Sequence, residues 1–304
     1  MPDVGFPSFE QLQVLITVAD TGSFSAAARR LNRAQSVISY AVAQLEEQLG
    51  LAVFDRSGRI PQLTEGGRAL LADARRATAS LDALRARASA FQQGIEAELR
   101  VGIDVMVPVG TVVHVLEAFA SRFPTVGLRL CMEALGGIAE LVMGENCDFG
   151  IGTELTAMPD TIRLQPIGSV RLVPVAAPNH ALSRSQEPVG REAVRDATQI
   201  VLSDRSALTK GQDIAVLSLR TWRVGDLGAK HALLRAGLGW GNMPALMVAE
   251  DLASGRLVQL ALREGRSYDY PLGLIRRGDR LLGPAAGWLA DELVQALSRL
   301  SQEP

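Results

Sequence analysis

The sequence predicts an α/β protein made of three parts. Residues 1–63 are predicted to form an all-α winged helix-turn-helix, residues 64–94 a long linker helix, and residues 95–304 a two-lobed α/β domain. Three observations lead to this prediction. Apolar residues near the N-terminus repeat at helical spacing in three short segments. A proline-free stretch with a heptad repeat follows, and from Glu98 onward short β-rich runs alternate with amphipathic helical segments.

The bulk composition limits the classes of protein that remain. A chain of 304 residues, 47% of them hydrophobic, can bury two or three domain cores. The formal net charge of −2 gives no overall signal for nucleic acid or for a membrane surface. Two cysteines are too few for a disulfide scaffold. We find no signal-peptide pattern and no apolar run of the ~18 residues that a membrane span needs, so we expect a soluble cytoplasmic protein with no membrane partner.

Three helices and a hairpin are predicted within the first 65 residues. Ser8 and Gln11 form a capping-box pattern ahead of the first helix. The second helix covers residues 24–31, and its alanines allow another helix to cross closely. The third helix lies within residues 33–50 and ends at a glycine, the residue type that favours a helix end. Residues 53–63 then predict a small hairpin with a basic, glycine-containing tip.

The third helix has an outer face unlike an ordinary solvated one. Its inner side is an apolar stripe formed by Ile38, Ala41, Val42, Leu45 and Leu49. Its outer side is short, uncharged and rich in hydrogen-bonding groups: Gln35, Ser36, Ser39, Tyr40 and Ala43. Such a face can meet the base edges of a major groove, or phosphate oxygens. The helix N-terminus and nearby cations would bind further phosphates, the cations being Arg29, Arg30, Arg33, Arg56 and Arg59.

The charge of this segment opposes the DNA-binding interpretation. Residues 1–65 hold those five arginines against seven acids: Asp3, Glu10, Asp20, Glu46, Glu47, Asp55 and Glu65. A DNA-binding module is usually basic overall. We therefore expect the arginines to gather on one face with the acids elsewhere, and we expect a single copy to bind DNA weakly. The alternative is a helical bundle that binds protein or nothing.

Heptad spacing dominates residues 64–94. Thr64 is a candidate N-cap, and the apolar positions then follow in steps of four and three: Leu70, Ala74, Ala77, Leu81, Leu84, Ala88 and Phe91. Arginines lie off this seam. The pattern predicts that the helix pairs with a second copy of the chain. The alternative is a helix that packs on its own domain.

The segment from Phe9 to Leu71 closely resembles the N-terminal domain of LysR-type transcriptional regulators. The resemblance includes "GSFSAAARRL", "SYAVAQLEEQLG", "LAVFDRSGR" and "LTEGGRALL". It implies contacts to bases or backbone from Gln35, Ser36, Ser39 and Tyr40, and contacts to phosphate or the minor groove from Arg33, Arg56 and Arg59. Many members carry proline after the glutamine, where this chain has Ser36; we expect that departure to change sequence preference only.

The resemblance also implies a set of partners. They are double-stranded promoter DNA with an approximate inverted repeat, a second copy of the chain in a dimer or tetramer, a small-molecule effector, and RNA polymerase. The effector would change DNA bending or polymerase contact by favouring one quaternary state. The rival interpretation is a transport-type binding protein or an enzyme built on the two α/β lobes. The missing signal peptide opposes the first, and the missing catalytic constellation opposes the second.

Strands and helices alternate through the C-terminal two-thirds, which predicts parallel α/β sheets. Two lobes of similar composition resemble the family's effector domain, itself similar to periplasmic binding proteins. By that resemblance the first lobe covers residues 99–162 and 268–304, and the second covers residues 163–267. The cleft between them would bind the effector, because open α/β sheets bind ligands at the carboxyl ends of their strands.

Candidate effector-binding residues follow from position at strand and helix ends: Asp104, Val105, Met106, Gly136, Ser203, Asp204, Ser206, Asp226 and Lys230. A carboxylate at Asp104 suits a cationic or hydroxylated ligand, and its alternative role is a helix cap. The alternative for Lys230 is an ion pair with Asp226, four residues earlier. Asp104 and Lys230 imply ligands of opposite charge, and the sequence does not choose between them.

Other chemistries find no support in the sequence. The histidines His114, His180 and His231 have no metal-ligand spacing, so we expect no metal and no cofactor. The alternating glycines of "GLGWG" follow a predicted helix, and a dinucleotide fingerprint would precede one. Cys131 and Cys147 both fall in the first lobe, and we expect them to be buried, inert thiols. The alternative is a redox switch like that of the family's peroxide sensors, although those use cysteines of the second lobe. We therefore expect no enzymatic activity.

Overall fold

The computed structural model describes residues 5–58, 60–155, 160–185, 187–203, 206–209, 215–264 and 267–300. The chain divides into two compact units, residues 1–90 and residues 91–304, and each is described by itself. Among the described residues, no helix combines the length and the hydropathy that crossing a bilayer would require.

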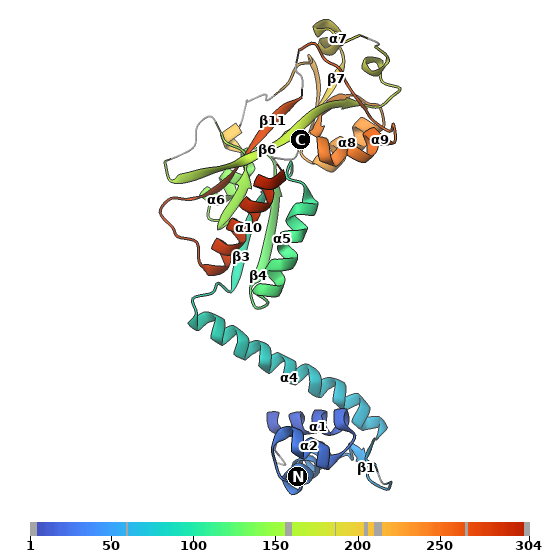
Figure 1. The fold of residues 1–304 in the computed structure, drawn as a ribbon, viewed down its shortest axis with the longest axis vertical. Helices are drawn as coiled ribbons and strands as arrows, with labels where there is room; N and C mark the ends of the chain where they lie inside the picture. Colours follow the sequence, from blue (N-terminus) through green and yellow to red (C-terminus); the bar gives the residue numbers. More distant parts are fainter. Residues whose placement is uncertain are drawn as a thin grey trace. The chain divides into compact units, whose positions relative to one another are not determined.

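The N-terminal unit has the helices and the hairpin that the sequence predicts. Its elements are α1 (Phe9–Thr21), α2 (Phe24–Leu31), α3 (Gln35–Leu49), β1 (Phe54–Asp55), β2 (Gln62–Leu63) and α4 (Glu65–Gln92) (Figure 1). The capping box of Ser8 and Gln11 is confirmed, with both reciprocal hydrogen bonds present. Gly50 closes α3 with a left-handed backbone, φ 67°, a conformation that suits glycine.

A small apolar core fixes the three first helices against one another. It is formed by Val14, Leu15, Val18, Ala27, Ala28, Ile38, Val42 and Leu45, with Val53, Phe54 and Ala74 beside them. Ile38, Val42 and Leu45 are fully buried, so the inner stripe predicted for the third helix is confirmed. Because these positions are apolar at helical spacing, burying them turns the opposite side of α3 to the surface.

The third helix, the hairpin and the linker helix meet at Val53. The Glu46 carboxylate of α3 accepts the backbone N–H groups of Val53 (2.8 Å) and Phe54 (3.0 Å). The Val53 carbonyl accepts the Thr64 N–H (3.0 Å), and Thr64 caps α4 by accepting the Gly67 N–H at 2.9 Å. A Cβ on Gly67 would lie 2.1 Å from the Val53 carbonyl oxygen, so only glycine permits this approach.

The C-terminal unit is built on one mixed sheet. Within the described residues its strand order is β4-β3-β5-β11-β6-β9-β7-β8, with β10 paired to β6. The strands are β3 (Glu98–Asp104), β4 (Gly127–Glu133), β5 (Phe149–Gly152), β6 (Ile162–Ala176), β7 (Thr198–Leu202), β8 (Arg220–Val224), β9 (Trp240–Pro244), β10 (Val258–Gln259) and β11 (Tyr268–Arg277). β3, β4 and β5 run parallel, as do β7, β8 and β9.

Helices cover both groups of parallel strands. They are α5 (Val109–Arg122), α6 (Gly137–Met143), α7 (Arg191–Asp196), α8 (Leu227–Arg235), α9 (Ala245–Ala253) and α10 (Pro284–Leu300). α5 packs on α10, where Phe119, Phe123 and Trp288 stack at centroid distances of 5.3–6.3 Å. α8 and α9 lie side by side at another part of the sheet (Figure 1).

The sheet is mixed, whereas the sequence predicts parallel α/β sheets. β6 and β11 pair antiparallel over Ile162–Ala176 and Tyr268–Arg277, and β11 also pairs antiparallel with β5, as β6 does with β9. These two long strands join both parallel groups in one sheet (Figure 1). The predicted lobe boundaries, 162/163 and 267/268, fall at the starts of these strands. Since β6 and β11 are shared by both groups, the division into lobes stays a prediction.

The alternating glycines of "GLGWG" have a packing role. Gly239 precedes β9 and Gly241 lies within it, and a Cβ on either would come within 2.7 Å of a carbonyl oxygen of β7, on Thr198 or Ile200. Trp240 points the other way, is fully buried, and donates its indole N–H to Ser218 at 3.0 Å. The sequence predicts no strand here, because glycines weaken the apolar pattern of a strand.

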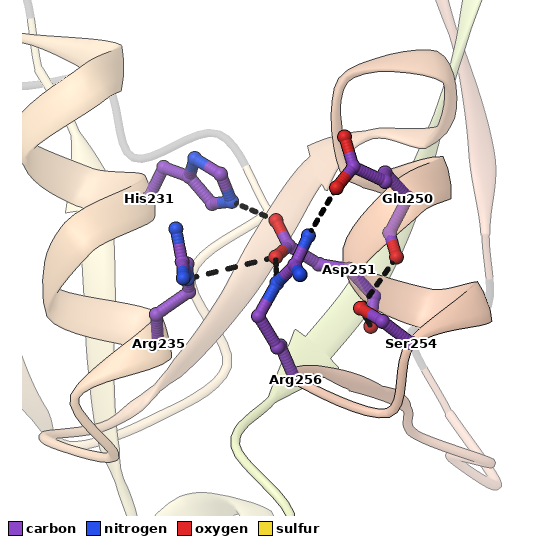
Figure 2. A network of polar contacts seen from close by, with 6 residues as sticks. All are labelled: His231, Arg235, Glu250, Asp251, Ser254 and Arg256. Carbon is purple, nitrogen blue, oxygen red and sulfur yellow. Dashed lines mark hydrogen bonds and ion pairs between the residues drawn. The ribbon is translucent and has the colours of Figure 1, made fainter.

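A charged network fastens α8 to α9 (Figure 2). The buried Asp251 carboxylate lies 2.6 Å from His231 Nε2 and accepts a hydrogen bond from Arg256 Nε at 2.5 Å. Arg235 Nε lies 3.5 Å away, and Arg256 also pairs with Glu250 at 2.7 Å. The hydrogen bonds from Arg256, then from His231, hold the pKa of Asp251 below its ordinary value.

Replacing Asp251 by asparagine should weaken the C-terminal unit. The substitution leaves Arg235 and Arg256 without their shared counterion and removes the carboxylate that contacts His231. Because both arginines are partly exposed, we expect a loss of roughly 1–3 kcal/mol in unfolding free energy. Urea denaturation at pH 7 measures it. The control is Asp269→Asn, which breaks an exposed pair with Arg171 and should cost less than about 1 kcal/mol. Equal losses of unfolding free energy for the two variants would show that the Asp251 network does not stabilise the packing of α8 on α9.

Candidate DNA-binding surface and effector site

The outer face of α3 is exposed and uncharged. Gln35 and Ser36 are exposed, Tyr40 keeps 67% of its surface, and Ser39 is half-buried. Ala34 begins the helix with no side-chain cap, so the first backbone N–H groups of α3 have no side-chain acceptor there. A helix start of this kind attracts anionic oxygens. The surface therefore combines groups that bind phosphates with groups that can meet base edges.

The arginines around this face are partly neutralised. Arg33 lies 3.8 Å from Glu10, and Arg56 pairs with Glu46 at 2.8 Å while its guanidinium lies over the Phe24 ring. The expectation that the acids lie apart from the arginines is therefore wrong for these two pairs. Arg59, also predicted to bind DNA, lies outside the described residues.

The heptad seam of α4 divides into two parts. Ala74 is buried in the core of its own domain and Leu70 packs partly against it, so the prediction that Ala74 meets a second chain is wrong. Its place against the three-helix core is set by the close approach of α4 at Gly67. The remaining seam residues face outward, with Leu84 62% and Phe91 66% exposed: Ala77, Leu81, Leu84, Ala88 and Phe91.

Asp104 is enclosed by the protein. Its carboxylate accepts the Met106 N–H (2.9 Å) and the Tyr270 hydroxyl (2.8 Å), and none of its surface is exposed. Burial, then the charge of Asp104, raise the pKa of Tyr270. The prediction that Asp104 presents its charge to a ligand is therefore wrong for this structure. Its alternative role as the cap of α5 is wrong too, since Pro108 occupies that position.

Several other predicted effector residues are partly or wholly covered. Met106 and Ser206 are buried, Val105 is half-buried, and the Ser206 hydroxyl accepts the Leu208 N–H at 3.1 Å. Gly136 begins α6. Ser203 is half-buried just after β7, and its N–H bonds to the Val224 carbonyl of β8 at 2.9 Å. Asp204 lies outside the described residues.

The start of α8 brings Asp226 and Lys230 together in one turn. Asp226 is the exposed N-cap and accepts the Ala229 N–H at 2.6 Å. Lys230 is 4% exposed, and this burial lowers the pKa of its ammonium to about 8. Among the described residues, no ion pair joins these two side chains, so the alternative of an Asp226–Lys230 pair is wrong.

Tyr270 is the side chain that occupies Asp104, and the sequence did not predict this contact. It holds Asp104 from 166 positions away in the chain, together with the buried Thr153 that hydrogen-bonds its hydroxyl. No local pattern links these residues. The sequence shows two tyrosines around an aspartate at the start of a strand segment whose remainder is apolar, "YDYPLGLI", and nothing in it singles out Tyr270.

Comparisons with known proteins agree with both units. Residues 9–68 match the family model of the bacterial regulatory helix-turn-helix protein, lysR family, and residues 92–298 match the LysR substrate binding domain. Together the two matches define a transcriptional regulator with a DNA-binding domain and an effector-binding domain. The chain belongs to the LysR family, so the resemblance and the fold class predicted from the sequence are confirmed.

Relatives of similar length carry the same kind of name. The HTH-type transcriptional regulator YeeY of Escherichia coli K12 is 28% identical over 95% of this chain and 93% of its own. The HTH-type transcriptional activator AllS of Klebsiella pneumoniae is 27% identical over 82% and 93%. Among solved structures, ArgP from Mycobacterium tuberculosis shares the fold with a TM-score of 0.53, at 23% identity over 97% of this chain and 98% of that one.

Replacing Lys230 by methionine should stabilise the C-terminal unit. At pH 7 the lysine is protonated in both the folded and the unfolded chain, so the folded state carries the full cost of burying the charge. With a pKa lowered from 10.5 to about 8, removing that charge should add at most about 3.4 kcal/mol. Urea denaturation at pH 7 measures the gain.

The gain should depend on pH in one direction. Between pH 8 and pH 10.5 the folded lysine loses its proton while the unfolded one keeps it, so the wild type becomes more stable and the advantage of Lys230→Met shrinks. The matched control is Arg220→Met, which removes an exposed cation at the opposite end of β8. A variant that is less stable than the wild type at pH 7 would contradict the assignment of a buried charge.

Proposed function

We propose that the chain reads promoter DNA with the outer face of α3, using Gln35, Ser36, Ser39 and Tyr40, while Arg33, Arg56 and Arg59 reach phosphates. One observation carries the proposal: this face is exposed and free of charged side chains, although the opposite face is fully buried in the domain core. A carboxylate on such a face would repel the DNA backbone, whereas hydroxyl and amide groups match the donors and acceptors of base edges.

Pairing of two chains completes the DNA-binding unit in this proposal. The exposed apolar residues of α4, from Leu81 to Phe91, form a seam that one chain leaves uncovered. A second copy would cover it and would place two recognition helices on one DNA, so the site is an approximate inverted repeat. Pairing also compensates for the weak DNA affinity expected of one domain with so few positive charges, because two linked domains bind the same DNA more tightly than one.

The C-terminal unit in this proposal binds a small-molecule effector near the ends of β7 and β8. The description of its family model supports a ligand-binding role, and the names of the relatives support regulation without catalysis. The effector acts by favouring one arrangement of the oligomer on promoter DNA, with RNA polymerase as the recipient of that change. The setting of such a regulator is the cytoplasm.

A mobility-shift assay on the DNA beside the chain's own gene tests the recognition surface. Ser39→Asp places a carboxylate on the outer face of α3, and we expect the shift to be lost while the oligomer measured by sedimentation is unchanged. The matched control is Ser185→Asp, which adds the same charge to the other unit and should leave the shift intact. The wild-type affinity should also fall with rising salt, because released counterions drive phosphate contacts.

Two results would overturn the placement of α3. One is normal DNA binding by Ser39→Asp. The other is equal loss of binding by Ser185→Asp, which would mean that added negative charge anywhere on the chain prevents binding.

A further inference from the structure

Lys230 lies in the first turn of α8, the helix that begins at the carboxyl edge of the second group of parallel strands. The Ser203 N–H bonds to the Val224 carbonyl, so the ends of β7 and β8 lie side by side, and α8 begins directly after β8. Lys230 is the fourth residue of α8. Because helical side chains tilt toward the helix N-terminus, its side chain leaves α8 on the side of this edge. Sheets of this type bind ligands here.

A glycine makes room for the lysine. The Cε atom of Lys230 lies 3.2 Å from the position that a Cβ on Gly241 would occupy, and that Cβ would also lie 2.7 Å from the Ile200 carbonyl oxygen. The methylene chain of Lys230 therefore runs between α8 and the sheet, over a strand position that has no side chain. This enclosure fixes the ammonium in place and keeps it from reaching freely into solvent.

The ammonium sits where a positive charge is doubly unfavourable. Its side chain is almost wholly buried, and the first turn of a helix carries the positive end of the helix dipole. The nearest carboxylate along the helix, Asp226, is engaged with the Ala229 N–H. Within the described part of the chain, no ion pair or side-chain hydrogen bond compensates Lys230. A buried charge without a counterion is costly, so an external anion would relieve that cost.

Asp104, the candidate of opposite charge, differs in every one of these respects. Its carboxylate already accepts hydrogen bonds from Met106 and Tyr270 and has no exposed surface. It therefore offers nothing to a cationic ligand. Of the two opposite charges that the sequence placed at this domain's strand ends, only that of Lys230 lacks a partner among the described residues.

We infer that the effector carries a carboxylate or phosphate group, and that the Lys230 ammonium binds one of its oxygens at the edge formed by β7, β8 and α8. This inference rests on the proposed function, since it names the chemical class of the ligand of the same domain. A lysine ammonium is a compact point charge with three donors, which suits a single anionic oxygen. The half-buried Ser203, at the end of β7, lies at the same edge and can orient a hydroxyl or a second oxygen.

Thermal unfolding of the full chain in matched pairs of small probes tests the inference. The probes are benzoate against benzamide, succinate against succinamide, and inorganic phosphate against chloride, all as sodium salts or neutral amides at equal ionic strength. The proteins are the wild type, Lys230→Met and the control Arg220→Met. Each titration records Tm against probe concentration, because a ligand that binds the folded state raises it.

We expect at least one anion to raise the Tm of the wild type and of Arg220→Met by several degrees, saturably, while its neutral partner does not. Lys230→Met should show a higher Tm in chloride and no shift with that anion. The inference is overturned if no anion shifts the wild type, if an amide acts as strongly as its acid, or if Lys230→Met responds as the wild type does. A DNA-binding assay separates the two proposals. If Lys230→Met still binds DNA but no longer responds to the anion, both proposals hold. If the wild type does not bind DNA, the proposed function is contradicted, while the anion response still tests the inference.

Discussion

The carboxylate of Glu46 governs how the N-terminal unit can face DNA. It accepts two consecutive backbone N–H groups, those of Val53 and Phe54, and it pairs with Arg56. One side chain of α3 therefore fixes the backbone where the hairpin begins and also holds one of the hairpin's arginines. The Val53 carbonyl in turn receives Thr64 at the start of α4. Recognition helix, hairpin and linker helix therefore meet at one residue. Glu46, whose negative charge is unfavourable for DNA binding, is therefore the side chain that holds these three elements together.

Three charged side chains of the C-terminal unit are buried, and they differ in how far the protein compensates their charge. Asp104 is satisfied by a backbone N–H and a tyrosine hydroxyl, and it closes the turn after β3 against β11. Asp251 is satisfied by His231 and Arg235 of α8 and by Arg256 of the turn after α9. Lys230 has no such compensation in the described residues. The first two therefore stabilise the fold, while the third weakens it, which is the pattern expected of a group kept for binding.

The sequence predicted the N-terminal unit well because its determinants are local. Caps, helical spacing and the glycine at position 50 lie within a few residues of the elements they define, and the inner face of α3 follows from periodicity alone. The arrangement of the large sheet could not be predicted this way. β6 and β11 are joined by pairing across about a hundred positions, and β9 was hidden by its glycines.

The candidate sites show the same limit. The uncharged face of α3 could be read directly from spacing, but the burial of Ala74 depends on how closely α4 approaches the core at Gly67. Asp104 and Lys230 looked equivalent in sequence, since each is a charge at a strand or helix end. Their difference comes from Tyr270 and Gly241, which reach them only through the folded sheet.

The central claim is that the outer face of α3 lies in the major groove. The most direct measurement attaches an iron chelate to a cysteine placed at Ser36, in a chain where Cys131 is replaced by serine, and maps where the bound DNA is cut. The account predicts cuts clustered in two major-groove segments of the protected site, one for each half-site of the inverted repeat. Efficient DNA binding with cuts confined to flanking DNA, or with no cuts at all, would contradict it.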